Sequence, residues 1–133
     1  MIFPTQKVWL TGVESTGKST LAAALAQRCD SLWVREYARI YLDALPRDYT
    51  QTDIDHIAAG QLRAVEQQLP KANQYLFCDT GMLVLKIWSM HKYGNCSSFI
   101  VHQLHRQHGD CHLLCSPKGV KWEYDPLRET PNL

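Results

Sequence analysis

The chain has 133 residues, with 14 Lys and Arg against 13 Asp and Glu and a formal net charge of +1. This length suits one domain with its own core, and the balanced charge excludes a strongly basic protein that binds nucleic acid or a membrane surface. No apolar run approaches the ~20 residues that span a bilayer, and the first residues do not form a signal segment. We therefore expect a soluble protein that acts on a small molecule.

The cysteine pattern indicates a reducing compartment. Five cysteines, an odd number, are spread over apolar or helical segments rather than forming a compact disulfide framework. They are Cys29, Cys78, Cys96, Cys111 and Cys115. We expect free thiols and a cytoplasmic location.

The first predicted element, a short strand over residues 7–11, leads into a phosphate-binding loop. Residues 12–19 match the pattern G-x-x-x-x-G-K-[ST]. The two glycines let backbone N–H groups point at an anion, and the following helix adds the positive end of its dipole. Lys18 would hold the β- and γ-phosphates, Ser19 would offer its hydroxyl to Mg²⁺, and Thr20 could reach an earlier phosphate. The predicted phosphate-binding residues are Gly12, Val13, Glu14, Ser15, Thr16, Gly17, Lys18, Ser19 and Thr20.

A second buried strand is predicted over residues 32–34, and the charged segment 35–39 follows it at once. In a parallel sheet, the segment just beyond a strand's carboxyl end lines the ligand crevice. Helical spacing then continues until Pro46. The next helix has Thr50 as a good N-cap and Asp53 in its first turn. Its apolar stripe consists of Ile54, Ile57, Ala58, Leu62, Val65 and Leu69.

The third predicted strand, residues 75–79, is an apolar run closed by Asp79. Strands of this form carry the carboxylate that assists Mg²⁺ in phosphate-loop enzymes. Two helices should follow, one ending near Gly94 and one near Gly109, before a fourth strand over residues 111–115. Strands that alternate with helices predict a single α/β domain with a mostly parallel sheet covered on both faces.

Two carboxylates are candidates for the chemistry, because Glu36 and Asp79 follow different strands and should project into the crevice that contains Lys18. We assign Asp79 mainly to Mg²⁺, through water, and Glu36 to the acceptor hydroxyl as general base. The alternatives are a helix N-cap for Asp79 and a surface ion pair with Arg35 or Arg39 for Glu36.

Basic and aromatic residues supply further candidates. Arg39 and Arg128 could neutralise a transferring phosphate. Residues 116–133 have the composition of a lid that closes over the phosphates, and the alternative is a disordered tail. Tyr37 or Trp33 could stack on a flat base, although aromatic residues at helical or strand spacing more often lie in the core. The histidines and cysteines of residues 102–115 are not spaced to converge on zinc.

Several of these segments together resemble the ribosylnicotinamide kinase domain of NadR-type proteins. The matching segments are GVESTGKSTL at residues 12–21, REYAR at 35–39, Tyr49-Thr50 with Asp53 and Gln61, FCDT at 77–80, and Trp122 with Asp125 and Arg128. The resemblance runs over nearly the whole chain. It implies a phosphate-loop NTPase fold, a three-layer sandwich, for residues 1–133, with residues 116–133 as the lid.

The activity implied by the resemblance is ATP-dependent phosphorylation of the ribose 5′-hydroxyl of nicotinamide riboside. The product would be nicotinamide mononucleotide for NAD salvage, and Mg²⁺ would be required. The implied catalytic residues are Lys18, Glu36, Asp79 and Arg128. The implied substrate-binding residues are Glu36, Tyr37, Arg39, Asp53, Gln61, Trp122 and Asp125, and the implied Mg²⁺ ligands are Ser19 and Asp79.

The chain departs from the family pattern at both ends. NadR-type proteins often carry a DNA-binding region and an adenylyltransferase domain ahead of the kinase, so neither activity is expected here. Their kinases also continue past the lid, whereas this chain is expected to lack the C-terminal strand and helix. The alternatives are therefore a nucleotide-binding module without turnover, or a kinase for another nucleoside or small hydroxyl metabolite. An unpaired edge at residues 111–115 would favour a homodimer.

Overall fold

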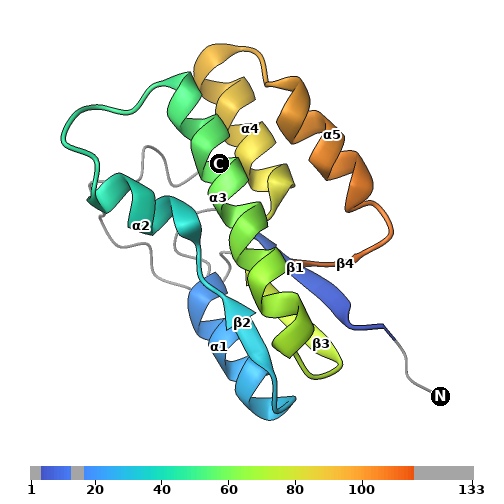
Figure 1. Cartoon of the computed structure of the whole chain (residues 1–133). Coiled ribbons are helices and arrows are strands. Elements are labelled where there is room, and N and C mark those ends of the chain that lie inside the picture. The colour runs from blue at the N-terminus through green and yellow to red at the C-terminus, as the bar shows by residue number, and fades with distance from the viewer. Residues whose placement is uncertain (1–3, 13–16, 116–133) are drawn as a thin grey trace.

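The computed structural model describes residues 4–12 and 17–115 and confirms the predicted α/β architecture. Four strands form one sheet in the order β2-β3-β1-β4, and every pairing between them is parallel (Figure 1). The strands are β1 (Gln6–Gly12), β2 (Leu32–Val34), β3 (Tyr75–Asp79) and β4 (Cys111–Cys115). The helices are α1 (Lys18–Arg28), α2 (Tyr37–Asp43), α3 (Gln51–Gln68), α4 (Met82–Tyr93) and α5 (Ser98–Arg106), with a short 3₁₀ turn, η1 (Leu69–Lys71).

The helices pack on the two faces of the sheet because side chains alternate along β1. Val8 and Leu10 are buried in one cluster with Ala22 and Ala26 of α1. Trp9, between them in sequence, is buried on the opposite face with Val65 of α3. Alternation of this kind is what the period of a strand imposes. It yields the predicted three layers, with α1 on one side of the sheet and α3 on the other.

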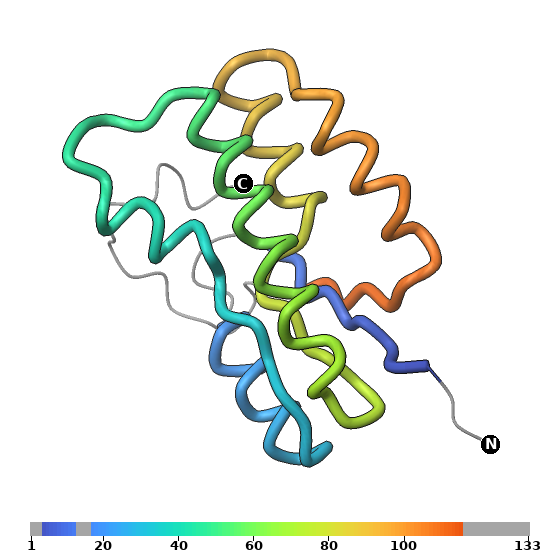
Figure 2. Tube along the Cα trace, in the orientation of Figure 1, coloured from blue at the N-terminus to red at the C-terminus, as the bar shows by residue number. Residues whose placement is uncertain are grey.

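Helices also connect strands that follow one another along the chain. The chain trace in Figure 2 shows α2 and α3 between β2 and β3, and α4 and α5 between β3 and β4. Parallel neighbours require such crossovers, since a tight turn can join only antiparallel strands. All strands therefore end at the same edge. The register places Leu10 beside Asp79 and Gly12 beside Cys115.

Helix α3 is the longest helix of the described residues, and its sequence explains both ends. Thr50 is the N-cap, as predicted, and it forms a capping box with Asp53 in the first turn. The predicted apolar stripe faces the core, and Pro70 lies in the 3₁₀ turn that follows the helix. In the middle, Gly60 leaves space for Tyr37 of α2, because an added Cβ would lie 2.0 Å from Cε1 of that ring. This contact brings α2 close to α3.

The five cysteines are free thiols. Burial raises the pKa of the Cys78 thiol to about 12, so it stays protonated and unreactive at neutral pH. Within residues 4–12 and 17–115, no group of three or more His, Cys, Asp and Glu side chains could hold a metal ion. None of the helices in these ranges combines the length and apolar character needed to cross a membrane.

Candidate active site

Polar side chains from three segments meet at the carboxyl edge of the sheet. Lys18 and Ser19 begin α1, Glu36 lies just beyond β2, and Asp79 ends β3. Ser19 is hydrogen-bonded to Asp79, and Lys18 forms an ion pair with Glu36. The structure thus brings together four residues that the sequence predicted as one site. They lie where open α/β sheets bind their ligands.

The phosphate loop begins and ends as its pattern requires. Gly12 closes β1, and Gly17 caps α1 with φ +77°. Nothing lies within 4 Å of a Cβ built at Gly17, so the backbone conformation, not a lack of space, favours glycine there. The predicted phosphate contacts Val13, Glu14, Ser15 and Thr16 lie outside the described residues.

The contact between Ser19 and Asp79 joins the two predicted Mg²⁺ ligands. Ser19 Oγ donates a hydrogen bond to Asp79 Oδ2 at 2.6 Å. Asp79 is fully buried, and burial is the largest influence on its pKa, which it raises. The hydrogen bond from Ser19 lowers this pKa, whereas the charge of Glu36 raises it further. A nearby cation would therefore stabilise the ionised carboxylate.

The charge of Lys18 acts on both carboxylates. Its Nζ is 3.8 Å from Glu36 Oε2, and the Lys18 charge lowers the pKa of Asp79. The Lys18 side chain is 12% exposed and that of Glu36 is 33% exposed. Glu36 thus remains accessible to a ligand in the crevice, in contrast to Asp79.

Thr80 also belongs to this cluster, although it is not among the predicted site residues. Its hydroxyl accepts a hydrogen bond from Lys18 Nζ at 3.2 Å and donates one to Glu36 Oε2 at 3.0 Å. It also lies 3.5 Å from Asp79 Oδ1. The signal that could have identified it is its position directly after the strand-ending carboxylate, where side chains reach the same crevice.

Helix α3 holds the start of α2 through Gln61. The Oε1 atom of Gln61 accepts a hydrogen bond from the backbone N–H of Tyr37 at 2.8 Å. Gln61 is 2% exposed, and its Nε2 has no hydrogen-bond partner among the described residues. Tyr37 and Arg39, both predicted to contact substrate, are partly buried on α2. Because Glu36 is the N-cap of α2, the hydrogen bond to the Tyr37 N–H also helps to position Glu36.

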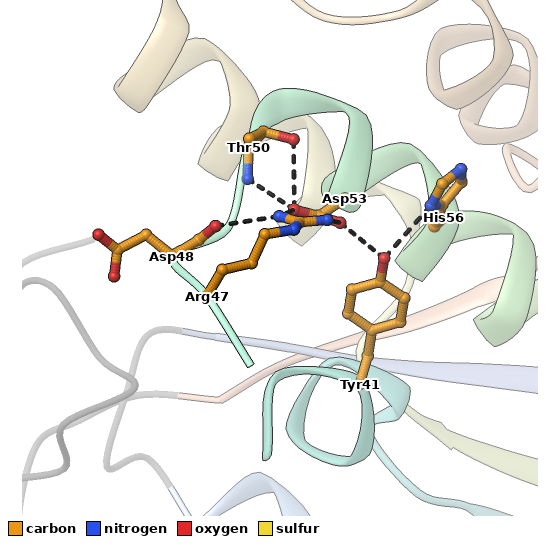
Figure 3. A network of polar contacts seen from close by, with 6 residues as sticks. All are labelled: Tyr41, Arg47, Asp48, Thr50, Asp53 and His56. Atoms are coloured by element: carbon orange, nitrogen blue, oxygen red, sulfur yellow. Dashed lines mark hydrogen bonds and ion pairs between the residues drawn. The ribbon is translucent and has the colours of Figure 1, made fainter. Parts of the chain in front are cut away.

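Asp53, another predicted substrate contact, lies in the polar network drawn in Figure 3. Both of its carboxylate oxygens have protein partners: Arg47 donates at 2.7 and 3.1 Å, Tyr41 OH donates at 2.6 Å, and the Thr50 N–H donates at 2.7 Å. Tyr41 OH also lies 3.2 Å from His56 Nδ1. The network joins Arg47, in the segment between α2 and α3, to the first turn of α3. The hydrogen bonds from Arg47, then those from Tyr41 and Thr50, hold the pKa of Asp53 well below its ordinary range.

The network predicts an acid-sensitive contribution to stability. The folded-state pKa of Asp53 lies below its unfolded value of about 3.9, so the stabilisation is fully present above that value and is lost as the pH falls through the folded-state pKa. We expect the wild type to be more stable than Asp53→Asn at pH 7, with the difference shrinking below about pH 4. Urea unfolding followed by circular dichroism at several pH values measures it.

The matched control for this experiment is Asp55→Asn, which removes a carboxylate from the same helix outside the network. Its unfolding free energy should follow that of the wild type through the acid range. A difference between wild type and Asp53→Asn that stays constant from pH 7 to pH 2 would contradict the prediction.

The remaining predicted residues, Trp122, Asp125 and Arg128, lie outside the described residues, as does the predicted lid, residues 116–133.

The chain is similar to a known family and to several solved structures. A family model described as an AAA domain matches residues 7–132. No curated protein matches the chain. Among solved structures, a NadR protein in complex with NAD and AMP-PNP is 27% identical with a TM-score of 0.61, and the match covers 77% of this chain and 29% of that one.

Two further structures resemble the chain. A NadR protein in complex with NR is 24% identical with a TM-score of 0.65, covering 83% of this chain and 33% of that one. A deoxyadenosine kinase from M. mycoides with products bound is 16% identical with a TM-score of 0.50, covering 90% and 60%. These two likenesses show the fold. The chain spans about a third of the length of the NadR proteins it matches.

Proposed function

This chain belongs to the family described as an AAA domain, and from that premise we propose that it is an ATP-dependent kinase. It would transfer the γ-phosphoryl group of ATP to the ribose 5′-hydroxyl of nicotinamide riboside, and the product would be nicotinamide mononucleotide. The observation that carries the proposal is the cluster of Lys18, Ser19, Glu36 and Asp79 directly beside the phosphate loop. Phosphoryl transfer mainly requires positioning and charge stabilisation, and this cluster provides groups for both.

Each residue of the cluster has a role in this reaction. Lys18 would bind the β- and γ-phosphates and offset the charge that spreads over the transferring oxygens. Glu36 would accept the proton of the ribose hydroxyl, because its carboxylate is partly exposed and follows the second strand. Asp79 is less suited to that step, since it is fully buried and bonded to Ser19.

The donor set at Ser19 and Asp79 fits Mg²⁺. A hydroxyl and a carboxylate offer hard oxygen ligands, and their oxygens lie 2.6 Å apart at the start of α1. Mg²⁺ prefers oxygen and is usually held by one or two carboxylates together with phosphates and waters. Bound there, the ion would neutralise charge on the β- and γ-phosphate oxygens.

The choice of acceptor rests on the resemblance to NadR-type proteins. The motif residues that carry it include Glu36, Tyr37 and Gln61, which the structure gathers at the junction of β2, α2 and α3. The NadR structures were determined in complexes with NR and with NAD and AMP-PNP. A nicotinamide nucleoside as acceptor and an adenine nucleotide as donor are consistent with those ligands.

Calorimetric titration with Mg·ATP, followed by nicotinamide riboside in the same cell, tests the proposal. We expect binding of both ligands and heat of turnover, with nicotinamide mononucleotide detected by chromatography. Thymidine and uridine serve as matched acceptors, since they carry the same 5′-hydroxyl on a different base. Faster phosphorylation of thymidine or uridine than of nicotinamide riboside would overturn the assignment of nicotinamide riboside as the acceptor. Nucleotide binding without any phosphorylated product would overturn the proposed kinase activity and support a nucleotide-binding module without turnover.

A further inference from the structure

Thr80 combines an unfavourable backbone conformation with a central position in the site. Its φ is +80°, in the left-handed region that β-branched residues rarely adopt. The surrounding structure fixes this conformation, because the Thr80 N–H donates a hydrogen bond to Leu10 O at 3.1 Å and the side chain is buried. Strained residues held in this way are concentrated at functional sites.

The neighbouring residue, Gly81, contrasts with Thr80 in its backbone conformation. Gly81 has an ordinary φ of −119°, and glycine is needed there for space, because an added Cβ would lie 2.8 Å from the ring of Trp9. At position 80, by contrast, the backbone favours glycine and the chain has threonine. The Thr80 side chain therefore has a role that offsets the cost of its conformation.

That role follows from the contacts of the hydroxyl. A hydroxyl has one proton and two acceptor lone pairs. Thr80 Oγ1 gives its proton to Glu36 Oε2 at 3.0 Å and receives a hydrogen bond from Lys18 Nζ at 3.2 Å. The ammonium and the carboxylate are themselves 3.8 Å apart. The hydroxyl thus bridges the phosphate-binding lysine and the carboxylate that faces the acceptor.

We propose that Thr80 is a positioning residue for phosphoryl transfer, whose strained backbone delivers its hydroxyl to Glu36 and Lys18. The proposal rests on the kinase function above and extends it to a residue outside the predicted site. The hydroxyl orients the Glu36 carboxylate, so that one of its oxygens is engaged with Thr80 and the other is directed to the substrate hydroxyl. In this role Thr80 acts through Glu36 and Lys18 rather than directly on the substrate or the transferring phosphate.

Three substitutions distinguish the effect of losing the hydroxyl from the effect of relieving the backbone strain. Thr80→Val keeps the shape and loses the hydroxyl, Thr80→Ser keeps the hydroxyl, and Thr80→Gly loses the hydroxyl and relieves the strain. We expect kcat to fall about 10- to 100-fold in the Val and Gly variants, the scale of a lost hydrogen bond to a charged group. The KM for ATP should change less than about threefold, and Ser should restore most of kcat.

Stability supplies a readout that a merely structural role would not reproduce. Thr80→Gly should have a higher unfolding temperature than Thr80→Val, whereas the two variants should have the same reduced kcat. A double-mutant cycle adds a second readout: if Thr80 acts through Glu36, then Thr80→Val combined with Glu36→Gln should be no slower than Glu36→Gln alone.

The outcomes distinguish this proposal from the one it rests on. A wild type that phosphorylates no acceptor overturns the kinase function and the role of Thr80 with it. An active wild type with an equally active Thr80→Val variant overturns only the role of Thr80. So does a double variant in which the two losses multiply, because independent residues would then be acting.

Discussion

Lys18→Ala is expected to abolish nucleotide binding and turnover together, with kcat/KM lowered by roughly 10³-fold or more. The Lys18 side chain is 12% exposed and its Nζ lies 3.8 Å from Glu36 Oε2, and its charge also lowers the pKa of Asp79. Without this cation, the charges of Glu36 and Asp79 would face the incoming phosphates without the Lys18 charge that offsets them. Calorimetric titration with Mg·ATP and steady-state kinetics measure the two losses separately.

The control for Lys18→Ala is Arg28→Ala, which removes one positive charge from the exposed end of the same helix. It should leave nucleotide affinity and kcat close to those of the wild type. ATP affinity of Lys18→Ala equal to that of the wild type would show that the loop at residues 12–19 does not bind the phosphates through Lys18.

Glu36→Gln is expected to lower kcat by ~10²-fold or more while leaving nucleotide affinity nearly unchanged. The amide keeps the size of the side chain and can still accept a hydrogen bond from Thr80, but it cannot take up the proton of the acceptor hydroxyl. Steady-state kinetics with nicotinamide riboside and a parallel ATP titration measure both quantities. A loss of nucleotide affinity as large as the loss of turnover would assign Glu36 to the Mg²⁺ shell instead.

Glu66→Gln is the matched control for the second experiment. Glu66 is an exposed carboxylate on α3, so its replacement changes the net charge by the same amount away from the carboxyl edge of the sheet. Unchanged kinetics in Glu66→Gln would attribute the effect of Glu36→Gln to the site rather than to the overall charge.

The predicted elements agree with the structure because their signals are local. The alternation of apolar runs with helical spacing predicted the four strands of the parallel sheet, and the Thr50 and Asp53 spacing predicted the start of α3. The approach of Glu36 and Asp79 to Lys18 could also be predicted, since parallel strands that end at one edge bring their next residues together.

Other parts of the site depend on contacts between residues far apart in the chain. Thr80 and Glu36 are separated by 44 positions, and their contact depends on the placement of β2 beside β3 in the sheet. The use of Gln61 to hold the Tyr37 N–H, 24 positions away, depends on the close approach of α2 at Gly60. The position of Thr80 after β3 can place it in the crevice, but no periodic or motif signal identifies Glu36 as its partner or the Tyr37 N–H as the partner of Gln61.

The sequence by itself determined the α/β class, the phosphate loop and the carboxylates that accompany it, because spacing and residue type encode these features within short segments. Only the tertiary structure decided the strand order, the enclosure of Asp53 by Arg47 and Tyr41, and the place of Thr80 between Lys18 and Glu36. These features arise when packed helices and strands bring distant side chains within hydrogen-bond distance, and that depends on the packing of the whole core.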